Sequence, residues 1–197
     1  ILPRRALVGM VHLPPLPGSS RASESIEAII EQAKWEAELL ARHGFDAVII
    51  ENYGDAPFQP GAVEPHTVVA MSLIVHEVRR SIALPLGVNV LRNDAISAVA
   101  IASLCGARFV RVNVHVGVAV TDQGLIEGQA HRSLLYRRRL NSQVGIFADV
   151  HVKHAAPLVG RDIAVTAAET AYRGLADALI LTGPATGQPV ALSLIHI

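Results

Sequence analysis

Short apolar segments rich in β-branched residues alternate six times with longer segments of helical periodicity along this chain. Parallel strands that helices cover on both faces have this composition, because neither face of their sheet meets water. The alternation therefore predicts an α/β fold with a parallel sheet. The predicted strands are residues 7–12, 46–51, 85–90, 108–114, 145–152 and 177–182.

The intervals between these strands carry the signals of helices. Ser23 and Asp94 stand where an N-cap side chain accepts a hydrogen bond from a free backbone amide. Gly44 and Gly174 follow two of the periodic segments at the position of a C-cap residue. The predicted helices are residues 23–43, 64–80, 94–105, 129–141 and 161–173, and residues 115–128 are predicted to form a long loop.

Two architectures fit this order of elements, a TIM (β/α)8-type barrel and an open doubly wound sheet. No predicted strand is followed by the Gly-x-Gly-x-x-Gly pattern that opens a dinucleotide-binding helix. Polar residues end several consecutive strands, and TIM barrels build their sites from the carboxyl ends of the strands. The sequence therefore favours the barrel.

The length of the chain conflicts with a complete barrel. A complete barrel has eight βα units and about 250 residues, whereas six units are visible in these 197 residues. We therefore expect residues 1–190 to form one incomplete barrel domain. Residues 191–197 are expected to be a non-native tail, because Ser193–Ile197 resembles a translated cloning scar.

Charge and cysteine content exclude several classes of protein. The 17 basic and 17 acidic side chains balance, which argues against a nucleic-acid partner. A single cysteine, Cys105, excludes an internal disulfide framework and predicts a reducing, cytoplasmic location. No uninterrupted apolar run reaches the length of a transmembrane helix.

Residues 144–157 combine an apolar strand with a cluster of titratable groups. Side chains alternate between the two faces of a strand, so Asp149, His151 and Lys153 are predicted to share one face. Buried polar groups are costly unless they are paired, and stability alone does not explain them here. We therefore predict one wall of a polar site in this stretch.

The ends of the other strands complete the predicted site, because all of them meet at one mouth of a barrel. The candidates for catalysis are Lys153, Asp149, His151 and Glu51. The candidates for substrate binding are His12, Asn52, Asn89, Arg111, Asn113, His115 and Thr182.

The chemistry of this site stays open at the level of sequence. Lys153 is a candidate amine of lowered pKa, and Glu51 and Asp149 are candidates for paired acid–base carboxylates. Alternatively, Arg111 and Asp149 form a structural ion pair, and His12 only orients its neighbours. A divalent metal held by His115, His151, Asp149 and Glu51 is a less favoured alternative. No metal is predicted, because no His-Glu-x-x-His or Cys-x-x-Cys spacing occurs, and no cofactor is identified.

Six motifs in these positions resemble the BtpA family, in the family's order and between about Leu7 and Gly187. The motifs are Gly9–Gly18, Glu51–Phe58, Gly87–Asp94, Arg111–His115, Thr121–Gly128 and Ala148–His154. The resemblance implies a barrel similar to the ribulose-phosphate-binding TIM barrels. It also implies a chain that continues beyond the Thr182–Gly187 loop into two further strands, which supports the expected truncation.

The resemblance and the polar strand ends lead to two functional hypotheses. The first is the binding or transformation of a small phosphorylated or sugar-like metabolite at the carboxyl ends of the strands. The second is a non-catalytic assembly or stability factor for a membrane protein complex such as photosystem I. It follows from the family alone, in which one member is associated with photosystem I and is peripheral to thylakoids. In that case the protein would be peripheral to a membrane.

Overall fold

The protein is described by a computed structural model that covers residues 2–183. Its main sheet has six parallel strands in the order β1-β2-β3-β4-β7-β9. These strands are β1 (Val8–His12), β2 (Ala47–Glu51), β3 (Leu86–Asn89), β4 (Phe109–Val112), β7 (Gly145–Asp149) and β9 (Ala178–Ile180). The helices are α1 (Ile26–Arg42), α2 (Pro65–Ser81), α3 (Ala95–Cys105), α4 (Ala130–Arg139) and α5 (Ile163–Ala168).

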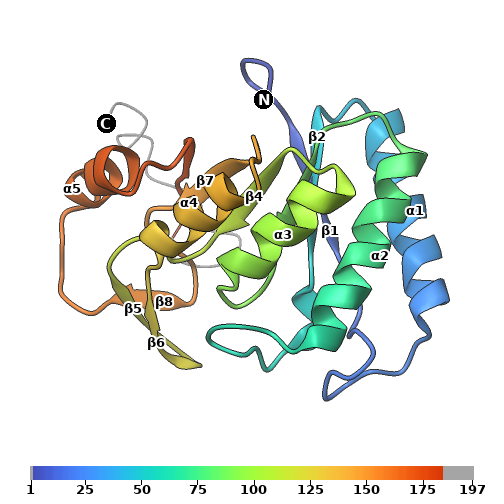
Figure 1. The fold of residues 1–197 in the computed structure, drawn as a ribbon, viewed down its shortest axis with the longest axis horizontal. Helices are drawn as coiled ribbons and strands as arrows, with labels where there is room; N and C mark the ends of the chain where they lie inside the picture. The colour runs from blue at the N-terminus through green and yellow to red at the C-terminus, as the bar shows by residue number, and fades with distance from the viewer. Residues whose placement is uncertain (1, 184–197) are drawn as a thin grey trace.

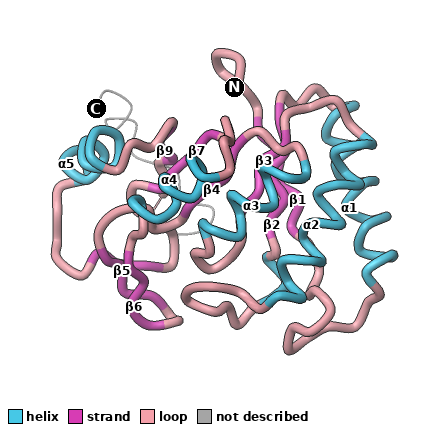
Figure 2. Tube along the Cα trace, viewed as in Figure 1, coloured by secondary structure: helices cyan, strands magenta, loops and turns pink. Residues whose placement is uncertain are grey.

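The order of the strands decides between the two predicted architectures. Each strand of the main sheet pairs with the next one along the chain, without the reversal that a doubly wound sheet requires. Helices α1 and α2 lie side by side at one end of the molecule, with α3 and α4 following along the sheet toward α5 (Figures 1 and 2). The chain is a singly wound, partial (β/α) barrel, and the predicted fold class is confirmed.

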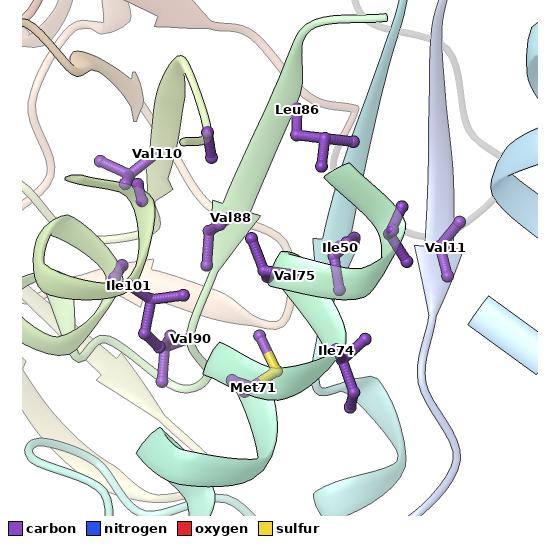
Figure 3. Close-up of a cluster of buried hydrophobic side chains, with 14 of the residues drawn as sticks. Val11, Ile50, Met71, Ile74, Val75, Leu86, Val88, Val90, Ile101 and Val110 are labelled. Carbon is purple, nitrogen blue, oxygen red and sulfur yellow. The ribbon is translucent and has the colours of Figure 1, made fainter. Parts of the chain in front are cut away.

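The main hydrophobic core lies between the sheet and its helices. Every second residue of the strands points toward the helices, including Val11, Ile50 and Val88, and all three are buried. Figure 3 shows these side chains in one buried cluster with Met71, Ile74 and Val75 of α2. Burial of one such side chain contributes about 1.5–3 kcal/mol, so this layer holds the helices on the outer face of the sheet.

A smaller apolar cluster occupies the opposite, inner face of the sheet. Its fully buried members are Phe109 and Ala47, and Ile49 is 6% exposed. The ring of Phe109 stacks on that of Phe147 at 4.5 Å between centroids. Side chains that point inward fill the interior of a barrel in the same way. This cluster forms the floor beneath the polar strand ends.

Two predicted helix starts can be compared with the structure. The cap of α1 is Ser25, not Ser23, because the Ser25 hydroxyl accepts the amide of Ala28 at 3.3 Å. Asp94 caps α3 as predicted and accepts the amide of Ser97 at 2.9 Å. Its second carboxylate oxygen accepts the amide of Val63 at 2.9 Å, so the cap also fixes the loop before α2.

The predicted loop 115–128 contains a β-hairpin. Strands β5 (Val118–Thr121) and β6 (Gly124–Glu127) pair in an antiparallel manner, and β8 (Ala155–Pro157) joins β5 from the segment after β7. The loop prediction was wrong because strands of four and three residues carry almost no periodic signal. The pairing of β5 with β8 joins segments that are distant in the sequence, so no local pattern announces it.

The last predicted helix, residues 161–173, is shorter and less regular than expected. It begins as α5 and continues as the π-helical turn η2 (Glu169–Arg173), which ends at Gly174. None of the helices in residues 2–183 is both long and apolar enough to span a membrane. The expected tail, residues 191–197, lies outside the described residues.

Candidate functional site

Polar side chains form one layer at the carboxyl ends of the strands, on the inner face of the sheet. The parallel register places His12 beside Glu51, and Glu51 beside Asn89. On the next strands Arg111 and Asp149 face the same interior as Phe109, because residues two apart share a face. The sequence placed these residues at strand ends, and the register brings them together.

Glu51 lies at the centre of the first half of this layer. Its side chain accepts the Asn89 amide at 2.8 Å and lies 3.6 Å from the Arg111 guanidinium. His12 Nε2 lies 4.0 Å from the other carboxylate oxygen, and its ring stacks on Tyr53 at 4.5 Å. Glu51 is buried whereas His12 is exposed, so His12 forms the solvent side of this half.

Asp149 lies at the centre of the second half. Arg111 donates to its two oxygens from Nε at 3.2 Å and from Nη2 at 3.0 Å, a bidentate pair. Asn113 Nδ2 donates to the same carboxylate at 2.8 Å. The Oδ1 atom of Asn113 is buried and has no hydrogen-bond partner in residues 2–183. Arg111 therefore joins the two carboxylates, and Asn113 keeps one free acceptor.

Burial governs the electrostatics of this pair. Desolvation raises the pKa of Asp149, although Arg111 and Asn113 oppose this by stabilising the carboxylate. Burial alone would lower the pKa of Arg111, but the nearby charges of Asp149 and Glu51 outweigh it and raise that pKa. Arg111 therefore stays a cation. In this pair it is Asp149 whose pKa is raised toward neutral pH.

Asn52 and Thr182 have mainly structural contacts. Asn52 Oδ1 accepts the Leu91 amide at 2.7 Å, and its Nδ2 donates to Asp55 at 2.9 Å. Thr182 Oγ1 donates to the carbonyl of His151 at 2.8 Å, beyond the end of β9. Both residues tie loops together at the mouth. Any role in substrate binding stays a prediction.

Strand β7 ends at Asp149, three residues before the predicted end at 152. His151 and Lys153 therefore lie in the turn that follows the strand and not on its face. The carbonyl of Lys153 accepts a bond from Arg92 at 2.7 Å, and the Lys153 side chain is half-buried. His151 Nε2 is buried without a hydrogen-bond partner in the described part of the chain. The roles predicted for the two residues stay predictions.

Arg92 and Tyr53 also belong to this region, although neither was among the predicted site residues. Arg92 is 8% exposed and lies within electrostatic range of Asp149 and Glu51. Its position just after a predicted strand is the signal in the sequence that places it at the mouth of the barrel. The stacking of Tyr53 on His12 depends on the fold, and no sequence pattern indicates it.

His115 is buried away from the carboxylates. Its Nε2 atom lies 2.8 Å from the carbonyl of Gly174, so Nε2 carries the proton, and its Nδ1 has no partner in residues 2–183. Burial lowers the pKa of His115, and the Gly174 carbonyl only partly opposes this. The residue links the end of β4 to the end of η2, which is a structural contact that the sequence did not reveal.

This environment predicts a pH-dependent stability. The pKa of His115 in the folded protein lies below the ordinary value of about 6.5. The contribution of neutral His115 to the free energy of unfolding is therefore fully present above about pH 6.5 and is lost as the pH falls through the folded pKa. A His115→Gln variant keeps an N–H donor but does not titrate. Urea unfolding between pH 7.5 and pH 5 measures the free energy of unfolding. We expect this free energy to fall less steeply with pH in the variant than in wild type, by up to about 1.4 kcal/mol per pH unit. His131→Gln, which removes an exposed histidine, should keep the wild-type profile.

The described residues contain no group of three His, Cys, Asp or Glu side chains arranged to hold one metal ion. The polar layer itself consists of two buried carboxylates, one arginine between them and two side-chain amides. Such a set can hold a polar ligand by hydrogen bonds and can transfer a proton through a carboxylate.

Comparison with known proteins places the chain in a family. The BtpA family matches residues 3–197. The chain belongs to the BtpA family. It is 54% identical to the photosystem I biogenesis protein BtpA of Synechocystis sp., over 93% of this chain and 64% of that protein. The chain therefore spans slightly under two thirds of the length of this relative.

Other BtpA-family relatives come from very different organisms. An uncharacterized protein of Thermococcus kodakarensis is 49% identical over 95% of this chain and 70% of its own length. An uncharacterized mitochondrial protein of Caenorhabditis elegans is 33% identical over 96% of this chain and 71% of its own length. The family resemblance seen in the six motifs is confirmed.

Solved structures support the barrel. A 7,8-dihydropteroate synthase of Vibrio fischeri superposes with a TM-score of 0.58 at 14% identity, over 95% of this chain and 65% of that chain. A 2,3-dimethylmalate lyase superposes with a TM-score of 0.53 at 14% identity, over 90% of this chain and 58% of that chain. Both are TIM-barrel enzymes, and at this identity the similarity concerns the fold alone.

Proposed function

We propose that this BtpA-family protein binds and transforms a small metabolite at the carboxyl ends of its strands. The observation that carries the proposal is the buried network of Glu51, Arg111, Asp149 and Asn113, in which one acceptor, Asn113 Oδ1, has no hydrogen-bond partner among the residues that the structure describes. Burying two carboxylates costs stability unless the arrangement serves a ligand or a reaction.

In this proposal Asp149 is the acid–base group. Burial raises the pKa of Asp149 toward neutral pH. A general acid–base group is most efficient when its pKa lies near the pH at which the protein works. Arg111 holds the carboxylate in one orientation, and Asn113 and Asn89 position the substrate. Glu51 is the second carboxylate, and the catalytic roles of His151 and Lys153, which lie in the turn after β7, stay predictions. The expected phosphorylated or sugar-like character of the substrate stays a prediction.

A second candidate function is assembly or stabilisation of a membrane protein complex without catalysis. It is supported by the name of the Synechocystis relative, a photosystem I biogenesis protein. Relatives in Thermococcus and in a nematode belong to organisms without a photosystem. This distribution argues against photosystem I as a partner that all of these relatives share.

The test compares two isosteric substitutions, one at the carboxyl ends and one at the amino ends of the parallel strands. Purified protein is incubated with a library of sugars, sugar phosphates, nucleosides and amino acids, and mass spectrometry records which compound is consumed. We expect Asp149→Asn to slow the conversion by at least about 100-fold, the size of a general acid–base contribution. The control Asp46→Asn changes a carboxylate that caps the Leu7 amide at the other end of the strands, and it should convert normally.

The second candidate predicts a different result. If no compound is consumed or stabilises the protein, and the protein co-purifies with a membrane complex equally well in both variants, the metabolite proposal is wrong.

A further inference from the structure

A cavity of about 550 Å³ opens beside the second half of the polar layer. Its walls come from β5, from the segment around β8 and from α5 with η2. In Figure 1, β5, β8 and α5 lie at the same end of the molecule. This volume lies in the range of small-molecule sites, about 300–1,000 Å³. Because Asn113 and Asp149 also line it, the cavity is continuous with the proposed site.

The polar end of the cavity contains two buried atoms that lack a hydrogen-bond partner among residues 2–183. They are Oδ1 of Asn113 and Nε2 of His151, and both residues line the cavity. Asn113 is only 4% exposed, and its Nδ2 is already committed to Asp149. A buried acceptor without a donor costs about 1–3 kcal/mol. A ligand that brings an O–H or N–H to Asn113 removes this cost.

The sides of the cavity that β5 and the segment after β7 form are apolar, whereas α5 and η2 add Thr166, Glu169 and Arg173. Val114, Val118 and Ala119 contribute from the hairpin side, and Val152 and Ala155 contribute from the segment after β7. No hydrogen-bonding side chain lies among these five residues. A sugar that carries hydroxyl groups along its whole length would leave several of them without partners against this wall.

The charges around the cavity do not favour a phosphate. Arg161 is paired with Glu169, so its charge is already neutralised. Asp149 is likewise paired with Arg111, which leaves exposed Arg173 as the remaining lining cation in the described residues. Phosphate sites generally gather several cationic or backbone donors around the anion. The described lining of this cavity therefore offers a phosphate few free donors.

We propose that the substrate is a small molecule with one hydrogen-bond-donating end and an apolar body. The donating group, a hydroxyl, amide or amine, contacts Asn113 and Asp149, and the apolar body fills the space beneath β5 and β8. This inference rests on the proposed function, because it names the substrate class of the same site.

The test uses probes that separate the two halves of the proposed ligand. Tyramine, benzamide and benzyl alcohol combine a donor with an aromatic body, whereas ribose and ribose 5-phosphate lack the apolar body. Binding is measured by NMR titration against wild type and Ala155→Trp, which adds bulk at a half-buried residue of the cavity wall. The matched control is Ala168→Trp, an exposed position on α5 that does not line the cavity. Thermal unfolding of both variants checks that they remain folded.

We expect at least one aromatic probe to bind wild type and Ala168→Trp equally, and to bind Ala155→Trp at least tenfold more weakly. Binding of ribose 5-phosphate that Ala155→Trp weakens and Ala168→Trp does not would show that the cavity takes a sugar phosphate; this would overturn the inference, while the proposed metabolite site would stand. If no probe of either kind binds, the inference is also wrong, and the conversion assay with Asp149→Asn decides separately on the proposed function.

Discussion

Replacing Arg111 by alanine is expected to lower the free energy of unfolding at pH 7 by about 3–5 kcal/mol. Arg111 makes a bidentate pair with Asp149 and lies 3.6 Å from Glu51, and both carboxylates are buried. Without the guanidinium, two negative charges remain in the interior with no cation between them. The cost is large because it is the desolvation of these charges, and not only the loss of one contact.

The pH dependence of this loss is a second check on its cause. In Arg111→Ala the pKa of Asp149 rises further above its unfolded value, because the guanidinium no longer opposes the desolvation of this carboxylate, so protonation of Asp149 stabilises the folded variant as the pH falls. Urea unfolding should therefore show that the difference in free energy of unfolding between wild type and Arg111→Ala becomes smaller from pH 7 to pH 5. The double variant Arg111→Leu/Asp149→Leu should recover much of the stability, because it removes the buried pair entirely. A deficit below 1 kcal/mol that does not change with pH would contradict this account.

The second large effect is expected in the floor of the barrel. Phe109 is fully buried and stacks on Phe147, and Phe109→Ala should cost about 3–5 kcal/mol through the lost burial and the cavity. Gly87 lies beside Phe109 in the register, and a Cβ at Gly87 would stand 2.3 Å from Phe109 Cε2. Gly87→Ala alone should therefore cost about 1–3 kcal/mol by overpacking.

The two substitutions should not be additive. In the Phe109→Ala background the ring that clashes with a Cβ at Gly87 is absent, so Gly87→Ala should cost at least 1 kcal/mol less than in wild type. Chemical denaturation of the four proteins of the cycle measures this coupling. Gly61→Ala is a control, because nothing lies within 4 Å of a Cβ at Gly61, and it should change stability by less than about 0.5 kcal/mol. Additive costs would show that Phe109 does not occupy the space beside Gly87.

The candidate site was predictable to the extent that it depends on position along a strand. Glu51 and Asn89 end apolar strands, and that alone places them at the mouth of any parallel barrel. The same reasoning failed after β7, where it extended the strand to residue 152 and put His151 and Lys153 on its face. Alternating Val150 and Val152 continue the pattern of a strand, but the chain turns at Asp149, and a short apolar run does not mark that end.

The sequence by itself determined the class of fold and the residues at the strand ends, because both follow from local periodicity and burial. Tertiary structure alone decided which polar groups meet. Arg111 and Asp149 lie 38 residues apart, and so do Glu51 and Asn89, so only the strand register brings each pair within bonding distance. The register also pairs Asn113 Nδ2 with Asp149, and this leaves Oδ1 as the buried acceptor at the centre of the proposed function.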